Sequence, residues 1–561
     1  MEPSFLDIKL SRRGSWVAAL VLFMLALGFR LAGIGWGLPN DLRNQSLHPD
    51  ENLNYVVATQ TPYLKPGFYH YGTLYFTALH IANDAGLSYG WVPSGENDNP
   101  LSGGIMTGRV ISALSGAVTV SLVFATLLLI TGTLGSFIGA VGMLLAPGHV
   151  VHSRFATTDV FATMLIALAA YLIVRFVSGK PEGGAQPKLP AIIGMGAVIG
   201  LAAGTKYAGL LMLLPLVFVL VGARVSWKGI AAGLGATVLG FLIATPGALL
   251  QSDLFSQHFM FEVSHSAEGH GLVFVDTPPG FMFHSLNLTE AFGLIPLVFG
   301  LAGLAWATSQ KNKWAMALSL FFIVYFVVIA QAEVKFLRYV LPLLPLVALG
   351  LGYLAGKCHE LGGWRRVVTG LIILMVGFTA ATTSGAFSMT RLMATPDPRD
   401  QAARWFNDKT DAQTTIGLVS DPWFYTPPFY PDTNLLAFQD RLTAMEQNPR
   451  LIRYIAPDGE KRDWDVRLLD QKPDYIVFSS FEFIDHDRLS EPHFVEFMER
   501  MPLEYDFIAI FWGPEPAFAT KLESMRFNRD MLRVIIRERY PKTHDMMYIR
   551  PTICVFKKKA T

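Results

Sequence analysis

Long, nearly uncharged apolar runs are the feature of this sequence that most restricts its fold. A helix that crosses a membrane needs about 20 mostly apolar residues. Only 16% of the residues are charged, whereas a soluble protein has about a quarter. The sequence therefore predicts a polytopic α-helical membrane protein with about eleven spans, at 15–35, 107–130, 133–148, 159–177, 189–204, 207–223, 229–248, 289–308, 314–331, 337–355 and 365–386.

The composition changes near residue 386, which predicts two domains, 1–386 in the membrane and 387–561 outside it. Short apolar runs alternate with amphipathic stretches in the second domain and predict a small α/β fold. Its role would be acceptor recognition or support of the outer loops. Strands are expected at Thr415–Val419, Leu435–Phe438, Tyr475–Ser479, Phe507–Phe511 and Ile553–Phe556, and helices near 398–409, 463–471, 489–501 and 526–539.

Lys and Arg in the short loops predict the orientation, because cytoplasmic loops carry an excess of them. With the N-terminus in the cytoplasm, the inside receives the basic residues of 9–13, 175–188, 224–228, 311–313 and 357–366. The outside then receives the loops 36–106, 149–158 and 249–288 and the C-terminal domain. We therefore expect a multi-pass protein of the inner or plasma membrane whose C-terminal domain lies outside.

Several cations break this rule, because they lie at the outer ends of spans. An unpaired charge at the centre of a bilayer costs at least about 2.5 kcal/mol, although each side chain alone can snorkel to the surface. Their common side indicates an anionic ligand such as a phosphate, whose oxygens Arg matches in a bidentate manner. The net charge of +1 gives no support to nucleic-acid binding. These cations are Arg109, Arg154, Lys206, Lys335 and Arg338.

The first outer loop, 36–106, is far longer than a turn, as functional loops often are. It contains His48-Pro49-Asp50-Glu51. Pro at the first helical position followed by two acids is an ordinary helix start. Adjacent carboxylates also suit catalysis, because one can accept the proton of an attacking hydroxyl while the other orients a group or binds a cation. The loop alone leaves both interpretations open.

The chain resembles the phospholipid-carrier-dependent glycosyltransferases of the GT-C class, which include the protein O-mannosyltransferases and the aminoarabinose transferases. The resemblance spans roughly residues 15–386 and rests on the order and common outer side of its segments. One position departs from the pattern, because Gly72-Thr73 stands where many relatives have Pro-Pro. The matching segments are Asp50-Glu51, Thr107–Leu114, Ser153–Asp159, Gly200–Tyr207 and Arg338–Pro345.

The resemblance implies a polyprenyl-phosphate sugar as donor, an outward active site and an inverting transfer to an acceptor hydroxyl. It implies Asp50 as the base, with Glu51 as the alternative and Asp159 as a second acid for the acceptor or a cation. Arg109, Lys206 and Arg338 would hold the donor phosphate and stabilise charge on the leaving group. Other candidates for donor or acceptor contacts are His48, His70, Tyr71, Glu268 and His270.

The outer loop 249–288 suits either closure over a lipid head group or a solvated connection. No histidine pair has a zinc-binding spacing, and a divalent metal stays an open alternative. A lipid or sugar transporter would be expected to show repeats and polar residues at the midplane, which we do not find. A membrane-anchored binding protein would leave the first loop and the outer cations unexplained. The sugar and the acceptor, whether lipid, glycan or protein, stay open.

Overall fold

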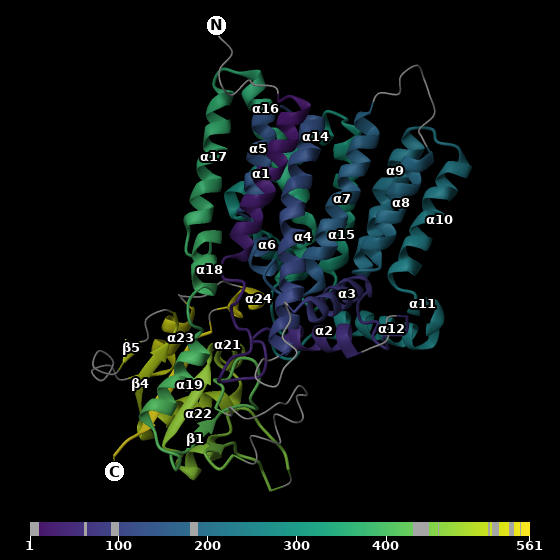
Figure 1. Ribbon diagram of the computed structural model, residues 1–561. Helices are drawn as coiled ribbons and strands as arrows, with labels where there is room; N and C mark the ends of the chain where they lie inside the picture. The colour runs from purple at the N-terminus through teal and green to yellow at the C-terminus, as the bar shows by residue number, and fades with distance from the viewer. Residues whose placement is uncertain are drawn as a thin grey trace.

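The computed structural model of the chain contains a bundle of apolar helices and an α/β region at one end of it (Figure 1). The predicted strand at Leu435–Phe438 lies outside the described residues. The structure describes residues 10–60, 64–90, 100–179, 189–429, 448–457, 459–513, 517–518, 527–537, 543–549 and 551–560.

The helices of the bundle overlap the spans expected from the sequence, and the polytopic helical fold is confirmed, while the number of about eleven spans stays a prediction. Among the described residues, seven helices are long and apolar enough to cross a membrane, or eight if the bent pair α13–α14 counts as one span. The bundle comprises α1 (Arg12–Leu31), α4 (Pro100–Ile130), α5 (Thr133–Leu144), α7 (Thr158–Ser178), α8 (Leu189–Ala203), η3 (Tyr207–Met212) with α9 (Leu213–Gly222), α10 (Trp227–Ala244), α13 (Gly280–Phe292), α14 (Leu294–Ser309), α15 (Lys313–Ala330), η4 (Leu337–Leu343) with α16 (Leu344–Leu361), and α17 (Arg365–Ala381).

Small residues and breaks shape this bundle. Helices α8 and α10 touch backbone to backbone, since a Cβ at Gly196 would lie 2.1 Å from the carbonyl oxygen of Gly233, and membrane helices often associate through such residues. Helices α13 and α14 meet at Gly293, whose φ of +90° favours glycine, and the chain bends there by 107°. Between α8 and η3, Lys206 has an extended backbone, which brings its side chain to the end of the bundle.

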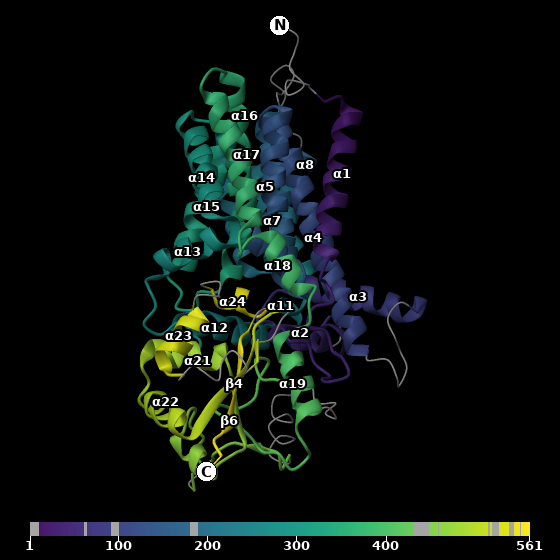
Figure 2. The same cartoon turned by 90° about the vertical axis from the view of Figure 1, so that its left-hand side faces the viewer.

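Short helices cover the end of the bundle that faces the α/β region (Figures 1 and 2). Helix α2 begins at Pro49 with Asp50 and Glu51 in its first turn, as the sequence predicts. The segment before α3 is fixed to the bundle, because the N–H of Leu74 donates to the carbonyl of Gly204 at 3.0 Å. These helices are α2 (Pro49–Gln60), α3 (Leu74–Tyr89), α6 (Pro147–His152), α11 (Gly247–Leu250), α12 (Ser252–Glu268) and α18 (Ala386–Met393).

The C-terminal part is a mixed sheet with helices on both faces, and the predicted α/β fold is therefore confirmed. The described strands pair in the order β2-β1-β3-β6-β4-β5, with β2-β1-β3 parallel and the remaining pairs antiparallel. The strands are β1 (Ile416–Leu418), β2 (Leu451–Ile452), β3 (Tyr475–Ser479), β4 (Tyr505–Phe511), β5 (Ala517–Phe518) and β6 (Ile553–Lys558), and the helices α19 (Pro398–Lys409), η5 (Val466–Gln471), α21 (Ser480–Leu489), α22 (Pro492–Glu504), α23 (Arg529–Arg537) and α24 (His544–Met547).

Alternation along the strands builds the two faces of this sheet. On β3, Tyr475 and Val477 pack with α19 through Phe406, whereas Ile476 and Phe478 pack with α21, α22 and α23. Apolar surface on both faces of the central strands is therefore buried between helices.

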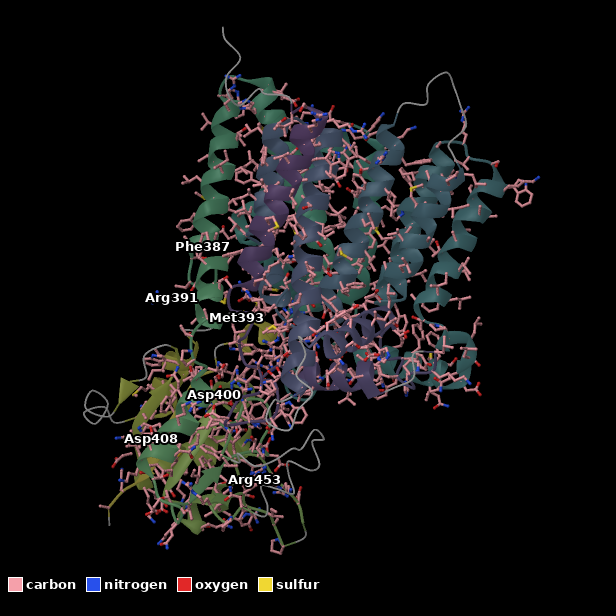
Figure 3. The ribbon with its side chains drawn as sticks, in the orientation of Figure 1. Phe387, Arg391, Met393, Asp400, Asp408 and Arg453 are labelled. Carbon is pink, nitrogen blue, oxygen red and sulfur yellow. The ribbon has the colours of Figure 1, made fainter. Side chains whose placement is uncertain are left out.

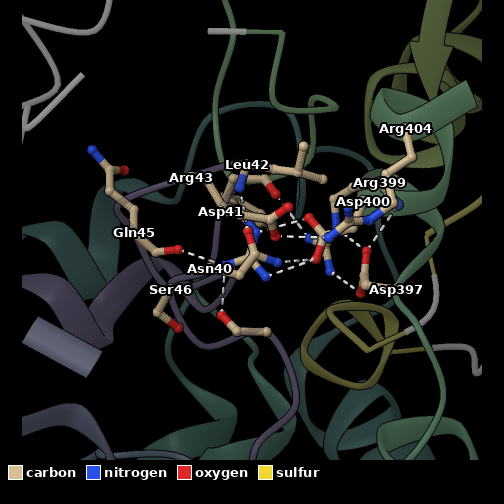
Figure 4. A network of polar contacts seen from close by, with 12 residues as sticks. Asn40, Asp41, Leu42, Arg43, Gln45, Ser46, Asp397, Arg399, Asp400 and Arg404 are labelled. Atoms are coloured by element: carbon tan, nitrogen blue, oxygen red, sulfur yellow. Dashed lines mark hydrogen bonds and ion pairs between the residues drawn. The ribbon is translucent and has the colours of Figure 1, made fainter. Parts of the chain in front are cut away.

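Polar contacts fix the α/β region to the start of the first outer loop (Figure 4). The guanidinium of Arg43 donates to both carboxylate oxygens of Asp400 at 2.9 and 3.0 Å, and Asn40 donates to the same carboxylate at 2.8 Å. The indole N–H of Trp36 donates to Asp397 at 3.1 Å. Figure 3 shows Asp400 just beyond Met393, where α18 leads from the bundle into α19. The two parts of the chain thus share a buried, charged junction.

Candidate active site

A cavity of about 560 Å³ lies between the end of the bundle and the α/β region. It contains three of the residues singled out from the sequence, Asp50, His270 and Arg338. Its walls are apolar and aromatic with a few polar groups, as is usual for a small-molecule site. The lining residues are Ser46, Pro49, Asp50, Asn52, Leu53, Val56, His270, Phe336, Arg338, Trp423, Phe424, His544 and Tyr548.

Asp50 presents its carboxylate to this cavity. Its side chain is 33% exposed and lies 3.6 Å from the guanidinium of Arg338. The backbone N–H of Asp50 donates to Nδ1 of His48 at 3.2 Å. His48 itself is buried between Phe155 and Tyr548, where burial lowers its pKa. His48 therefore caps α2, and Asp50 is the acid that a ligand in the cavity can reach.

Glu51 points the other way and is enclosed. It receives two hydrogen bonds from Arg109, at 2.8 and 2.7 Å, and neither side chain is exposed. The backbone N–H of Ala156 donates to it at 2.7 Å, and Ser46 also donates to it. Burial opposes ionisation, but Arg109 outweighs it and holds the pKa of Glu51 below its ordinary value. Glu51 is thus locked as a carboxylate behind the cavity wall.

Arg109 consequently does not face the cavity, although the sequence predicted it as a phosphate ligand. Its remaining donors reach the carbonyls of Ile34, at 2.6 Å, and Trp36, at 2.5 Å. The pair of Glu51 and Arg109 therefore joins α2 and α4 to the end of the first span. Its charge is matched inside the protein, which leaves Arg338 as the arginine that lines the cavity.

Arg338 lies at the start of η4 and is held by groups on three sides. Its guanidinium carbon lies 4.0 Å from the centre of the Phe336 ring. The carboxylates of Asp50 and Asp545 each lie 3.6 Å from one of its terminal nitrogens, which is longer than a direct hydrogen bond. Among the described residues, its Nη1, the nitrogen that faces Asp545, has no hydrogen-bond partner. The guanidinium therefore meets neither carboxylate in a direct hydrogen bond, and its Nη2, which faces Asp50 on the cavity side, can donate to an anion in the cavity.

Asp159 and Lys206 lie deeper than the cavity and form an ion pair with each other. The side chain of Asp159 is 5% exposed and that of Lys206 is 18% exposed. The ammonium of Lys206 also lies 5.1 Å from the ring centre of Tyr339, the neighbour of Arg338 in sequence. The structure thus brings the two predicted residues together beside Arg338, but neither lines the cavity.

Of the remaining predicted loop residues, His270 lines the cavity, whereas His70, Tyr71 and Glu268 do not. His70 bonds to Glu262 at 2.8 Å and stacks on a histidine of α12. The carbonyl of Tyr71 accepts a hydrogen bond from Tyr207 at 3.2 Å. Glu268 is exposed and accepts a hydrogen bond from a serine of its own helix. Tyr69 and His70 therefore support α12.

The packing of Gly72 explains why this chain has Gly72-Thr73 where many members of the family that it resembles have Pro-Pro. A Cβ on Gly72 would lie 2.2 Å from the carbonyl group of Gly204. The hydroxyl of Thr73 donates to the carbonyl of Ala244 at 2.8 Å. The Gly72-Thr73 pair thus packs directly on the ends of α8 and α10, where larger residues would not fit.

Arg154 and Lys335, the other two outer cations, are occupied by protein groups. Arg154 is buried and donates to the carbonyl of Phe29 and the hydroxyl of Thr390, both at 2.7 Å. It therefore satisfies a carbonyl that the end of α1 leaves free. Lys335 bonds to Glu333 at 3.1 Å and Thr277 at 3.2 Å. Of the five cations that the sequence suggested for an anion site, Arg338 therefore lines the cavity and Lys206 lies behind it.

The C-terminal region supplies cavity residues that sequence reasoning missed. His544, the first residue of α24, and Tyr548, which directly follows that helix, both line the cavity together with Trp423 and Phe424. Asp545 is fully buried and contacts η4 of the bundle. The one signal in the sequence is the apolar string from Met546 to Ile549 after polar residues, which is too short to identify a contact.

The described residues include no group of three or more His, Cys, Asp or Glu side chains arranged to hold a metal ion. Acidic groups near the cavity face cations of the protein instead. The chemistry that these residues offer is a carboxylate beside an arginine with unused donors, which suits proton abstraction next to a phosphate.

A family model described as dolichyl-phosphate-mannose-protein mannosyltransferase matches residues 61–249, about a third of the chain. The match confirms the resemblance predicted from the sequence over that segment, which includes Gly72, Arg109, Asp159 and Lys206. A search of curated protein sequences finds no match.

Several solved structures are similar at low identity. ArnT from Cupriavidus metallidurans bound to undecaprenyl phosphate is 14% identical, with 85% of this chain and 95% of that chain covered and a TM-score of 0.49. The oligosaccharyltransferase AglB from Archaeoglobus fulgidus, with an inhibitory peptide and a dolichol-phosphate, is 13% identical, with 91% and 74% covered and a TM-score of 0.48. The S. cerevisiae Pmt1-Pmt2 complex bound to the sugar donor is 20% identical, with 49% and 37% covered and a TM-score of 0.32.

Proposed function

We propose that this protein is an integral membrane glycosyltransferase that moves a sugar from a polyprenyl-phosphate donor to an acceptor hydroxyl. The observation that carries the proposal is the position of Asp50, a partly exposed carboxylate, 3.6 Å from Arg338 in one cavity at the end of a membrane bundle. The family match to mannosyltransferases that use a dolichyl-phosphate sugar supports the same chemistry.

In the proposed reaction, Asp50 accepts the proton of the acceptor hydroxyl as its oxygen attacks the anomeric carbon of the sugar. The bond between that carbon and the phosphate oxygen breaks, and polyprenyl phosphate leaves with the electron pair. A single displacement of this kind inverts the anomeric configuration. Arg338 neutralises the charge that develops on the leaving phosphate, while Lys206 and Asp159 support it from behind. The aromatic residues Trp423 and Tyr548 exclude water from the reacting atoms.

The charge pattern of the loops supports placing this cavity on the outer face of the cell membrane. Single cysteines test the orientation in intact cells, in a background without Cys358 and Cys554. A membrane-impermeant maleimide is expected to label Ser256→Cys on α12 and to miss Lys313→Cys at the opposite end. Labelling of Lys313→Cys but not of Ser256→Cys would contradict the orientation, and it would leave the proposed reaction unaffected.

The activity is tested with purified protein, synthetic undecaprenyl-phosphate hexoses and pentoses, and a membrane extract as the source of acceptors. Release of free undecaprenyl phosphate is measured by mass spectrometry. We expect release that needs both the protein and the extract. Movement of intact labelled lipid across vesicles without cleavage would instead support a flippase and contradict the transferase.

A further inference from the structure

Asp545 of the C-terminal region binds the start of a helix that belongs to the membrane bundle. Its two carboxylate oxygens accept hydrogen bonds from the backbone N–H groups of Leu337, at 3.2 Å, and Arg338, at 3.1 Å. These are first-turn N–H groups of η4, which a helix leaves without partners of its own. A carboxylate there is favoured by the positive end of the helix. Asp545 therefore caps a helix more than 200 residues away in the sequence.

The same carboxylate also faces the side chain of the residue it caps. Its Oδ2 lies 3.6 Å from the guanidinium of Arg338, while Asp50 lies at an equal 3.6 Å on the cavity side. Asp545 is fully buried, and its second neighbour is His152 at 4.0 Å. Arg338 is thus balanced between one carboxylate in the cavity and one behind it.

The segment that carries Asp545 is anchored in the bundle. Met546, Tyr548 and Ile549 are buried and belong to the apolar core that the bundle helices form. Arg399 of α19 donates to the carbonyl of Tyr548 at 2.7 Å, which ties the segment to the rest of the α/β region. Figures 1 and 2 both show α24 at the boundary between the two parts.

We propose that Asp545 is the positioning residue for Arg338, so that the C-terminal region completes the phosphate site of the membrane bundle. This inference rests on the proposed function, in which Arg338 binds the phosphate of the lipid donor. It assigns the α/β region a defined part in donor binding, beyond recognition of an acceptor or support of loops.

The physical reason is the competition between two carboxylates for one guanidinium. If Asp545 is removed, Arg338 loses the carboxylate that lies 3.6 Å from it behind the cavity, and its side chain closes on Asp50 in a direct ion pair. The N–H groups of η4 lose their acceptor at the same time, which loosens the backbone that carries Arg338. Both changes withdraw donors from a phosphate in the cavity.

The test is the Kd of undecaprenyl phosphate for the purified full-length protein. The variant Asp545→Asn keeps the volume of the side chain but removes its charge and one of its acceptors. Loss of a group that orients a ligand-binding side chain costs about 10- to 100-fold at metal sites, and we expect a loss of at least about tenfold here.

Asp465→Asn is the matched control. Asp465 is also a buried aspartate that begins a short helix, accepts from the backbone N–H of Arg467 at 2.9 Å and pairs with its side chain at 2.6 Å. It does not line the cavity. A merely structural role for Asp545 would lower the unfolding temperature of both variants and leave the Kd of the folded fraction unchanged in both.

The outcomes separate the two proposals. Weaker binding by Asp545→Asn with a wild-type Kd for Asp465→Asn supports the inference. An unchanged or tighter Kd for Asp545→Asn overturns the inference alone, and absence of binding by the wild-type protein overturns the proposed function with it.

A wild-type measurement keeps the inference testable if Asp545→Asn does not fold. Undecaprenyl phosphate is expected to slow the hydrogen exchange of the amides in 543–549 as well as those at the start of η4. Protection confined to the bundle would overturn the inference.

Discussion

The carboxylate of Glu51 and the guanidinium of Arg109 form a two-bond ion pair, with distances of 2.8 and 2.7 Å, in which neither side chain is exposed. The neighbouring Asp50, next to it in the first turn of α2, faces the cavity and is 33% exposed. Two adjacent acids that look equivalent in the sequence therefore have different surroundings. One joins three segments of the chain, and the other faces the cavity.

Replacing Glu51 is expected to damage folding rather than chemistry alone. Glu51→Gln leaves the charge of Arg109 buried without a partner, and breaking a buried pair costs about 3–5 kcal/mol. The fraction of monodisperse protein after heating measures the loss. Asp50→Asn is the adjacent control and should keep its wild-type unfolding temperature. A heat-stable Glu51→Gln protein together with an unstable Asp50→Asn protein would contradict the assignment of Glu51 to folding and of Asp50 to the cavity.

Arg338→Lys should weaken the binding of undecaprenyl phosphate although the charge is kept. Lys has no planar fork and cannot make the paired bonds to a phosphate that Arg makes, so the Kd should rise by about tenfold. Isothermal titration in detergent measures it. Arg154→Lys removes another buried arginine, one that binds the carbonyl of Phe29, and should change stability without changing the Kd. Equal effects of both variants on the Kd would argue against a specific role for Arg338.

Much of the fold could be predicted from the sequence because a long apolar run is by itself sufficient to indicate a membrane-spanning helix. The strands β3 and β6 could also be predicted, since their residues are apolar on both faces of the sheet. Asp50 and Arg338 were found together because the topology put them on one side. Lys206 and Asp159 were found too, but their mutual ion pair was not, because a sequence does not show which charges neutralise each other.

The part that could not be predicted is the contribution of the C-terminal region. Asp545 reaches Arg338 across more than 200 residues, through a helix of four residues (His544–Met547) that has no periodicity to detect. The sequence also placed Arg109 at the ligand, because it does not show that Glu51 neutralises this arginine inside the protein. Its partner Glu51 was itself a candidate, and only the packing of Ala156 and Ser46 around that carboxylate reveals the pair.

Glu482 should make the α/β region less stable as the pH rises. Burial raises its pKa from 4.5 to about 7, so the folded state binds a proton more tightly than the unfolded state. The stabilisation is complete below pH 4.5 and is lost as the pH rises through about 7. It amounts to ~3 kcal/mol.

Unfolding temperatures of the wild type and Glu482→Gln between pH 4.5 and 8 measure this effect. The amide does not titrate, and its single oxygen can still accept from Ser479 while its NH2 group faces the hydroxyl of Ser420. The wild type should therefore lose stability relative to the variant as the pH rises, and parallel curves would exclude the effect.

The buried junction between Arg43 and Asp400 should hold the α/β region against the first outer loop. Arg43→Ala breaks a bidentate pair of which only 7% and 13% of the side chains are exposed, at an expected cost of about 3–5 kcal/mol. Protease release of the C-terminal region should become faster. Arg404→Ala breaks the exposed pair with Asp41 nearby, which should cost about 1 kcal/mol or less. Similar release rates for the two variants would contradict the prediction that the buried pair stabilises the junction more than the exposed pair.

The most direct test of the account compares the turnover of Asp50→Asn with that of the wild type. Release of undecaprenyl phosphate from an undecaprenyl-phosphate sugar is measured in the presence of the acceptor extract, alongside the Kd of undecaprenyl phosphate. The account predicts a fall in turnover of about 10²- to 10⁴-fold with binding kept, because the amide cannot accept the proton while Asp545, fixed by the N–H groups of Leu337 and Arg338, still holds Arg338 from behind. Wild-type turnover by Asp50→Asn would contradict it.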